Sequence, residues 1–330
     1  MTHRPGGARV CAGAIARLTC LGLLAFAVAS APGTSSAQTA TQPARRTLHV
    51  EPSAFSAVVV YETEKERCMT FRWADNPNAE TCYLLADPDR VAFDYVRMMV
   101  SALLVQPEPQ RILVIGAGGG TLGRTFAALL PNAQVDNVDV DPAVIRVAEA
   151  YFGLQVSRQL RVHVADGREF IEQAIHDGHR YDLVMLDAFD ETYIPPHLIT
   201  HEFLLRVRDV LAERGVVVAN TAGRSGLGQR ELATYASVFG DLFEFPAHNR
   251  IIMATPGSLP PNETLRMNER QWRARLEIMG IDTDIFFQRL TRVQAGPGQD
   301  ASEVSSRLTD ANAGRALSSM QISNGVPTSP

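Results

Sequence analysis

The sequence contains no run of lysine and arginine residues, so it lacks the basic surface that is typical of nucleic-acid-binding proteins. It shows no internal repeat, which excludes solenoids and other repeat architectures. The formal net charge of -5 is small, and the hydrophobic share of 45% is that of an ordinary globular protein. These properties predict a globular chain that can bury one large core or two modest ones.

The N-terminal residues 1–37 have the three parts of a signal peptide. A positive region contains Arg4, Arg9 and Arg17. An apolar region follows at 18–31, and a run of small residues follows at 35–37. The apolar run is shorter than the roughly 20 residues that a membrane span needs. We therefore expect an exported protein, periplasmic or secreted, that begins with a linker at 38–47; an uncleaved N-terminal anchor is the alternative.

Beyond this leader only two cysteines remain, Cys68 and Cys82. In an exported protein such a pair is more often bridged than free, although two buried thiols are the alternative. A bridge would close a turn-rich hairpin and stabilise it by about 3 kcal/mol. One cysteine pair without nearby histidine gives too few ligands for a metal. His197 and His201 have helical spacing but no third ligand, so we interpret them as solvated helix residues and expect no metal site.

Residues 48–106 have the pattern of a small N-terminal β domain that ends in a connecting helix. β-branched and aromatic runs occur at 57–62 and 69–73, and a third strand-like run follows at 82–87. Apolar positions at helical spacing occupy 91–106. We therefore expect an antiparallel sheet followed by one helix.

Residues 107–258 alternate between apolar strand-like segments and helical segments, which predicts a doubly wound parallel sheet with right-handed crossovers. The five expected parallel strands are 111–116, 135–140, 160–165, 181–189 and 215–220. Two further runs at 242–247 and 250–256 predict a terminal antiparallel hairpin. We expect a helical extension at 259–292 and, because periodicity is weak there, a mostly disordered tail at 293–330.

Glycines follow the first apolar strand of this region. Gly116, Gly118 and Gly120 would let the backbone turn tightly and let a ligand approach without a clash with Cβ atoms. The segment also satisfies the dinucleotide fingerprint, and a tight turn without a ligand is a further alternative. The glycines alone therefore predict a nucleotide-binding loop of unspecified type.

Acidic residues end the next two strands. Asp139 is placed to accept hydrogen bonds from both hydroxyls of a ribose. Asp166, followed by Gly167, can reach an adenine amino group or can act as an ordinary helix cap, which is the role that we assign to Asp141. Because open α/β sheets bind ligands at the carboxyl edge, these strand ends together predict an adenosine site.

The fourth strand ends with Asp187 and, three residues later, Asp190. Primary amines have pKa values near 10 and must lose a proton before they attack, and an adjacent carboxylate can take that proton. A second acid can hold the other end of a polycation. A helix-capping Asp190 and a purely structural Asp187 are the alternative.

These segments, in this order, resemble the spermidine synthase, or polyamine aminopropyltransferase, family. The resemblance rests on ILVIGAGGGTLGR, VDVDPAVI, ADGREF and YDLVMLDAFD and covers about residues 50–255. It implies a small β domain followed by an S-adenosylmethionine-dependent methyltransferase-like α/β sheet. It also implies transfer of an aminopropyl group from decarboxylated S-adenosylmethionine to a polyamine such as putrescine, which leaves methylthioadenosine.

By position, the resemblance assigns the ribose to Asp139, the adenine to Asp166 and activation of the attacking amine to Asp187. It places polyamine contacts at Asp190 and Tyr95. It further implies a small-molecule amine as substrate and a possible homodimer. From the charge pattern, the ligand spacing and the short apolar run described above, we expect no nucleic acid, no metal and no stable membrane span after cleavage.

The sequence departs from the family at three positions near the amine. Gly119 replaces an acid of the glycine loop, Val96 replaces a common glutamine, and Glu191 replaces a common proline. Two other functions therefore stay open: a methyltransferase that uses intact S-adenosylmethionine, and a non-catalytic exported protein that binds nucleosides or polyamines. A nicotinamide-dependent dehydrogenase would explain the glycines and Asp139 but not Asp187.

Overall fold

The computed structural model describes residues 45–71, 79–188, 195–221, 223, 226–246, 249–294 and 307–323, which all belong to one compact unit, Pro43–Pro330. The predicted signal peptide lies outside the described residues, as do Asp190 and Glu191. Of the helices within the described ranges, none is long and apolar enough to cross a membrane.

The N-terminal part is a four-stranded antiparallel sheet with the order β1-β2-β3-β4. Its strands are β1 (Arg46–Glu51), β2 (Val58–Glu62), β3 (Glu66–Phe71) and β4 (Thr81–Leu84). Cys68 and Cys82 lie opposite each other on β3 and β4 and form the predicted disulfide. The bridge packs against Phe93, just before the connecting helix, so it fixes the hairpin next to that helix.

The connecting segment is α1 (Asp94–Val100) continued by a short 3-10 helix, η1 (Ser101–Leu104). From Met98 to Leu104 every side chain is buried, because the segment lies between the main sheet and the C-terminal helix α7 (Asn262–Ile278). The predicted helix therefore belongs to the core of the larger domain.

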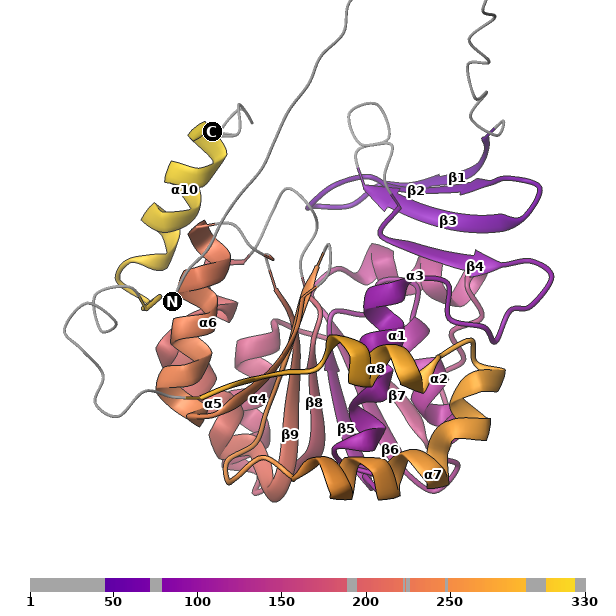
Figure 1. Cartoon of the computed structure of the whole chain (residues 1–330). Helices are drawn as coiled ribbons and strands as arrows, with labels where there is room; N and C mark the ends of the chain where they lie inside the picture. The colour runs from indigo at the N-terminus through magenta and orange to yellow at the C-terminus, as the bar shows by residue number, and fades with distance from the viewer. Residues whose placement is uncertain are drawn as a thin grey trace, which may run out of the picture. The chain divides into compact units, whose positions relative to one another are not determined.

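The main sheet has eight strands in the order β12-β10-β11-β9-β8-β5-β6-β7 (Figure 1). The strands are β5 (Arg111–Ile115), β6 (Gln134–Asp139), β7 (Leu160–Val164), β8 (Tyr181–Leu186), β9 (Leu211–Thr221), β10 (Leu242–Phe245), β11 (Arg250–Ala254) and β12 (Thr291–Val293). Strands β5 to β9 are parallel, whereas β10, β11 and β12 are antiparallel additions. This topology confirms the methyltransferase-like sheet with its terminal hairpin.

Helices cover both faces of the main sheet, and each face has its own apolar core (Figure 1). One core involves α1, α2 (Thr121–Leu129), α7 and α8 (Thr283–Arg289). The other involves α4 (Gly167–His176), α5 (His201–Val210) and α6 (Gly226–Phe239). A third cluster joins the small sheet to α3 (Pro142–Tyr151), whose Val144 and Val147 pack against Val58 and Val60.

The C-terminal segment is more ordered than the sequence indicated. Residues 307–323 are described and contain α10 (Ala313–Ser323), and Leu308 is fully buried beside Ile199 and Leu227. The backbone N–H of Leu308 donates to Thr234 Oγ1 at 2.8 Å. The expectation of a mostly disordered tail is corrected for these residues, because one leucine anchors a segment whose composition otherwise resembles a linker.

Candidate active site

The glycine loop connects β5 to α2 at the carboxyl edge of the sheet. Gly116 has φ 94°, and a Cβ atom there would lie 2.3 Å from the carbonyl oxygen of Asp187. Gly118 has φ 49°, and a Cβ atom there would meet nothing within 4 Å. The loop therefore requires glycine for close packing at Gly116 and leaves open space at Gly118, as a ligand-binding loop does.

The third glycine of this loop faces a different environment. A Cβ atom on Gly119 would lie 2.7 Å from Cγ2 of Thr81 and 3.3 Å from the ring of Phe152. The hydroxyl of Thr81 also lies 3.3 Å from that of Thr121. The small sheet thus fills the space where the resemblance led us to look for an acidic side chain.

Asp139 ends β6 beside the loop, and both of its carboxylate oxygens accept backbone hydrogen bonds. Ala117 N–H donates to Oδ2 at 2.8 Å, and Asp141 N–H donates to Oδ1 at 2.9 Å. Burial raises the pKa of Asp139, while these N–H donors oppose that rise. The backbone N–H of Gly118 also hydrogen-bonds to this carboxylate. Because a carboxylate offers about four lone-pair sites, it can still accept a hydrogen bond from a ligand.

Asp166 is the N-cap of α4. Its Oδ1 accepts from the backbone N–H groups of Arg168 and Glu169 at 2.9 and 3.2 Å. Its Oδ2 lies 2.7 Å from Nε2 of His197 in η2 (Pro196–Leu198). The side chain of His197 is 44% exposed, as expected for a solvated helix residue, and it pairs in addition with Asp166. A Cβ atom on Gly167 would lie 2.4 Å from Ile115 Cγ2, so glycine there lets α4 pack on β5.

Asp187 follows β8 and has polar partners from two other elements. The amide Nδ2 of Asn220, on β9, donates to Asp187 Oδ1 at 2.9 Å. The hydroxyl of Tyr95, on α1, also hydrogen-bonds to Asp187. Burial raises the pKa of Asp187 to about 7, although hydrogen bonds from both neighbours act in the opposite direction. A carboxyl group that titrates near neutral pH is suited to proton transfer.

The phenol of Tyr95 interacts with two carboxylates, those of Asp187 and Glu80. Burial raises the pKa of its phenol well above the usual value, and the negative charges of Asp187 and then Glu80 add to that rise. The side chain of Val96, in contrast, is buried in the apolar core. Sequence analysis missed Glu80, which stands next to Thr81 at the start of β4, because it carries no motif.

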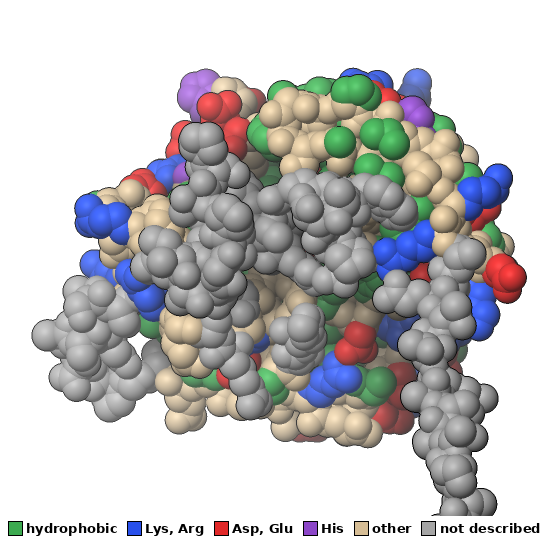
Figure 2. Space-filling model, turned by 90° about the horizontal axis from the view of Figure 1, so that it is seen from above, with side chains coloured by type: hydrophobic (Ala, Val, Ile, Leu, Met, Phe, Trp, Pro, Cys, Tyr) green, Lys and Arg blue, Asp and Glu red, His purple; other side chains and the backbone are tan. Residues whose placement is uncertain are grey.

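The structure thus brings the glycine loop, Asp139, Asp166, Asp187 and Tyr95 to one edge of the sheet. Asn220 was not predicted, although a polar residue that ends the apolar run of β9 at this edge was a usable signal. Figure 2 views the molecule from above; on the described part of this face, acidic and basic side chains are interspersed without a continuous basic patch.

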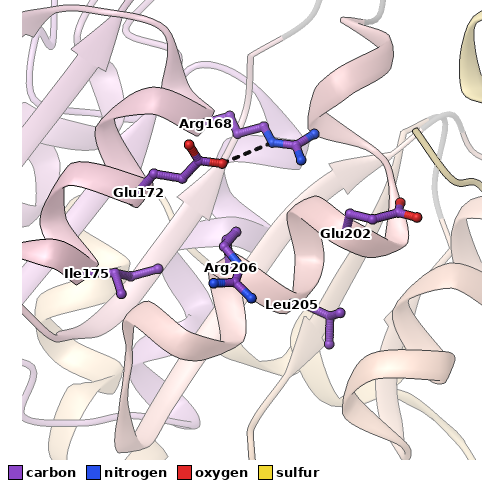
Figure 3. A pocket seen from close by; sticks show the side chains of 6 residues that line it. All are labelled: Arg168, Glu172, Ile175, Glu202, Leu205 and Arg206. Carbon is purple, nitrogen blue, oxygen red and sulfur yellow. Dashed lines mark hydrogen bonds and ion pairs between the residues drawn. The ribbon is translucent and has the colours of Figure 1, made fainter. Parts of the chain in front are cut away.

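A surface pocket between α4 and α5 is separate from this edge. It is lined by Arg168, Glu172, Ile175, Glu202, Leu205 and Arg206 (Figure 3). Arg168 forms a bidentate pair with Asp310 at 2.8 and 2.9 Å, and Glu202 accepts the backbone N–H of Asp310 at 3.0 Å. The pocket contains none of Asp139, Asp166, Asp187 and Tyr95, and the C-terminal segment already pairs with Arg168 and Glu202, two of the charged residues that line it.

Among the described residues, one group of potential metal ligands lies close together, namely Glu66, Cys68 and Cys82. Both of its sulfur atoms are in the disulfide. This group is therefore not a metal site in the oxidised chain.

Comparisons with known proteins agree with this geometry. The sequence model of the spermine/spermidine synthase domain matches residues 92–258. The polyamine aminopropyltransferase of Vibrio vulnificus (strain CMCP6) is 36% identical over 270 residues, which cover 80% of this chain and 90% of that protein.

Two further similarities are more distant. The eEF1A lysine and N-terminal methyltransferase of Bos taurus is 28% identical over 224 residues, which cover 60% of this chain and 32% of that protein. The crystal structure of a probable spermidine synthase from Corynebacterium glutamicum ATCC 13032 has a TM-score of 0.58 at 18% identity, covers 77% of this chain and 92% of its own, and shares the fold.

Proposed function

Because this chain belongs to the spermine/spermidine synthase family, we propose that it transfers an aminopropyl group from decarboxylated S-adenosylmethionine to a polyamine such as putrescine. Asp187 carries this proposal, since its carboxyl lies at a strand end and titrates near neutral pH. Tyr95 and Asn220 hold it from two sides. The other product is methylthioadenosine.

The donor would bind along three strand ends. The open backbone at Gly118 would approach its sulfonium end, and Asp139 would accept hydrogen bonds from the ribose hydroxyls. A remaining lone pair on Asp166 Oδ2, next to His197, would accept a hydrogen bond from the adenine amino group. Support for this placement comes from the order of these residues around the glycine loop.

The amine would be activated by Asp187. An ammonium group binds next to the ionised carboxylate, which takes one proton from it and leaves a lone pair on nitrogen. That lone pair attacks the carbon bonded to the sulfonium; the N–C bond forms, the C–S bond breaks, and the electron pair stays on sulfur. Holding the nitrogen in line with this carbon would supply most of the rate enhancement.

Purified protein, putrescine and decarboxylated S-adenosylmethionine test this function. Methylthioadenosine should accumulate, and Asp187→Asn should lower the rate by about 10²–10⁴-fold, the usual contribution of a general base. Asp209→Asn, an exposed acid paired with Arg206 on α5, is the control and should keep the parent rate. Lack of turnover with every polyamine tried would exclude this function.

Methyl transfer is less consistent with the comparisons. The similarity to the methyltransferase covers 32% of that protein, against 90% of the aminopropyltransferase. Thr81 leaves no space at Gly119 for the acidic side chain that the aminopropyltransferase resemblance implies, and this observation favours methyl transfer. Thermal shifts with the two donors discriminate, because an aminopropyltransferase should be stabilised more by the decarboxylated form.

We also propose that the protein is exported. The positive, apolar and small-residue regions of 1–37 and the disulfide between Cys68 and Cys82 support this. N-terminal sequencing of the mature protein should begin at Gln38, and the protein should fractionate outside the cytoplasm. An uncleaved N-terminus in the membrane fraction would instead indicate an anchor.

A further inference from the structure

Asn220 is a buried polar side chain beside Asp187 on the neighbouring strand. Leu186 pairs with Ala219 in the parallel β8–β9 ladder, so the next residues, Asp187 and Asn220, lie side by side. By alternation they point to the sheet face that carries Met185 and Val218 in the core shared with α1. Only 4% of Asn220 is exposed.

The two ends of the Asn220 amide have different surroundings. Nδ2 donates to Asp187 Oδ1 at 2.9 Å. Oδ1 is buried and has no hydrogen-bond partner in the described part of the chain. Buried polar atoms are nearly always paired in folded proteins. An unpaired acceptor on the side chain that hydrogen-bonds to Asp187 therefore indicates that this oxygen binds a ligand.

A neutral acceptor suits this position. A second carboxylate next to Asp187 would disfavour its ionised form, whereas an amide oxygen accepts an N–H without added charge. A primary ammonium group carries three N–H bonds and a secondary one carries two, and Asp187 removes the proton of only one of them. Another N–H therefore needs an acceptor while the lone pair turns toward the electrophilic carbon.

We propose that Asn220 positions Asp187 through its amide N–H and receives an N–H of the amine substrate on its amide oxygen. This inference rests on the proposed aminopropyl transfer. Two hydrogen-bond directions around the attacking nitrogen would then be fixed. One points to Asp187, which Asn220 holds in place, and the other points to the amide oxygen of Asn220 itself. Asn220 is thus both a positioning residue and a substrate contact.

Asn220→Ala removes both interactions, and Asn220→Asp keeps the size and an acceptor but loses the donor. Thr221→Val is the matched control, because Thr221 is the next residue of β9, is equally buried, and bonds to Arg250 on the opposite face. Binding of methylthioadenosine, measured by calorimetry, shows whether each variant keeps the folded nucleoside pocket.

The acidic limb of kcat/KM against pH should move up by about one pH unit in Asn220→Ala, since the lost hydrogen bond favoured the ionised carboxylate. Asn220→Asp should move it at least as far. Well above this limb, the KM for the amine should stay raised by about tenfold in Asn220→Ala, as expected for one lost hydrogen bond. The KM for the donor should match the parent in every variant, and Thr221→Val should also keep the parent's amine KM and pH profile.

An unmoved limb in Asn220→Ala would refute the positioning role, and an unchanged amine KM above the limb would refute the substrate contact. If the parent chain shows no turnover at all, the proposed function fails first. The positioning role is then tested without activity, by titration of the ¹³C-labelled Asp187 carboxyl by NMR, with Asp187→Asn to assign the signal. An equal pKa in the parent and Asn220→Ala would reject it.

Discussion

At the scale of single residues, the ionisation of Asp187 should control activity. Its pKa of about 7 means that the carboxyl is mostly protonated at pH 6 and mostly ionised at pH 8. Because only the ionised form accepts a proton from the amine, kcat/KM should rise about tenfold per pH unit below pH 7 and level off above it. Steady-state kinetics between pH 5.5 and 8.5 measure this; a flat profile would contradict the role of Asp187.

A second residue-scale prediction concerns the position where relatives are expected to carry an acid. Gly119→Asp should lower the free energy of unfolding by about 1–3 kcal/mol, since the new side chain overlaps Thr81. Thr81→Ala removes the atoms that clash, so the double variant should recover part of this loss. Urea unfolding of the four proteins gives the coupling energy; additive effects would show that the two residues do not compete for space.

These residues show what the sequence could and could not predict about the site. Asp139, Asp166 and Asp187 end three apolar strands, so their position at one edge followed from the strand pattern alone. The Asp187–Asn220 contact depends on the β8–β9 register, and the exclusion of an acid at Gly119 depends on Thr81 from another sheet. Long-range packing of this kind leaves no local sequence signal. The role expected for Asp190 stays a prediction, since it lies outside the described residues.

At the scale of elements, the hairpin of β3 and β4 should depend on its disulfide. Replacement of Cys68 and Cys82 by alanine should lower the free energy of unfolding by about 3 kcal/mol, because the unfolded chain loses a short covalent loop. A reductant should destabilise the parent by a similar amount and leave the double variant unchanged. Thermal unfolding with and without reductant tests this, and equal melting in all four samples would contradict it.

Strands with continuous apolar runs in the sequence were predicted well. Elements that are held in place by a few contacts distant in sequence were not. The five parallel strands and the terminal hairpin all occur where the apolar runs are. The first strand, β1, begins at Arg46, inside the segment expected to be a linker. Of its six residues only Leu48 and Val50 are apolar, and Val50 is exposed, so backbone pairing with β2 more than an apolar pattern makes this segment a strand.

At the scale of the whole molecule, the C-terminal segment ties three elements together. Leu308 is buried between η2 and α6, and Asp310 pairs with Arg168 of α4. Leu308→Ala should release this segment, because its only deeply buried leucine would lose most of its apolar contacts. Hydrogen exchange should then accelerate in 307–317 while the amides of β5 and β8 stay protected.

The matched control is Ile278→Ala, since Ile278 is an exposed aliphatic residue of α7 on another part of the surface. It should leave exchange of the C-terminal segment unchanged. Equal protection in Leu308→Ala and the parent would show that the ion pair of Asp310 holds the segment without the leucine.

The covalent bond in the hairpin has a practical consequence for anyone who prepares this protein. Cys82 directly follows Thr81, the residue that fills the space beside Gly119 in the glycine loop. Thiol reagents added during purification therefore act one residue away from the side chain that packs against the proposed nucleoside-binding loop. Donor affinities measured on oxidised and reduced batches should differ, so the redox history of a sample belongs with every binding constant reported for it.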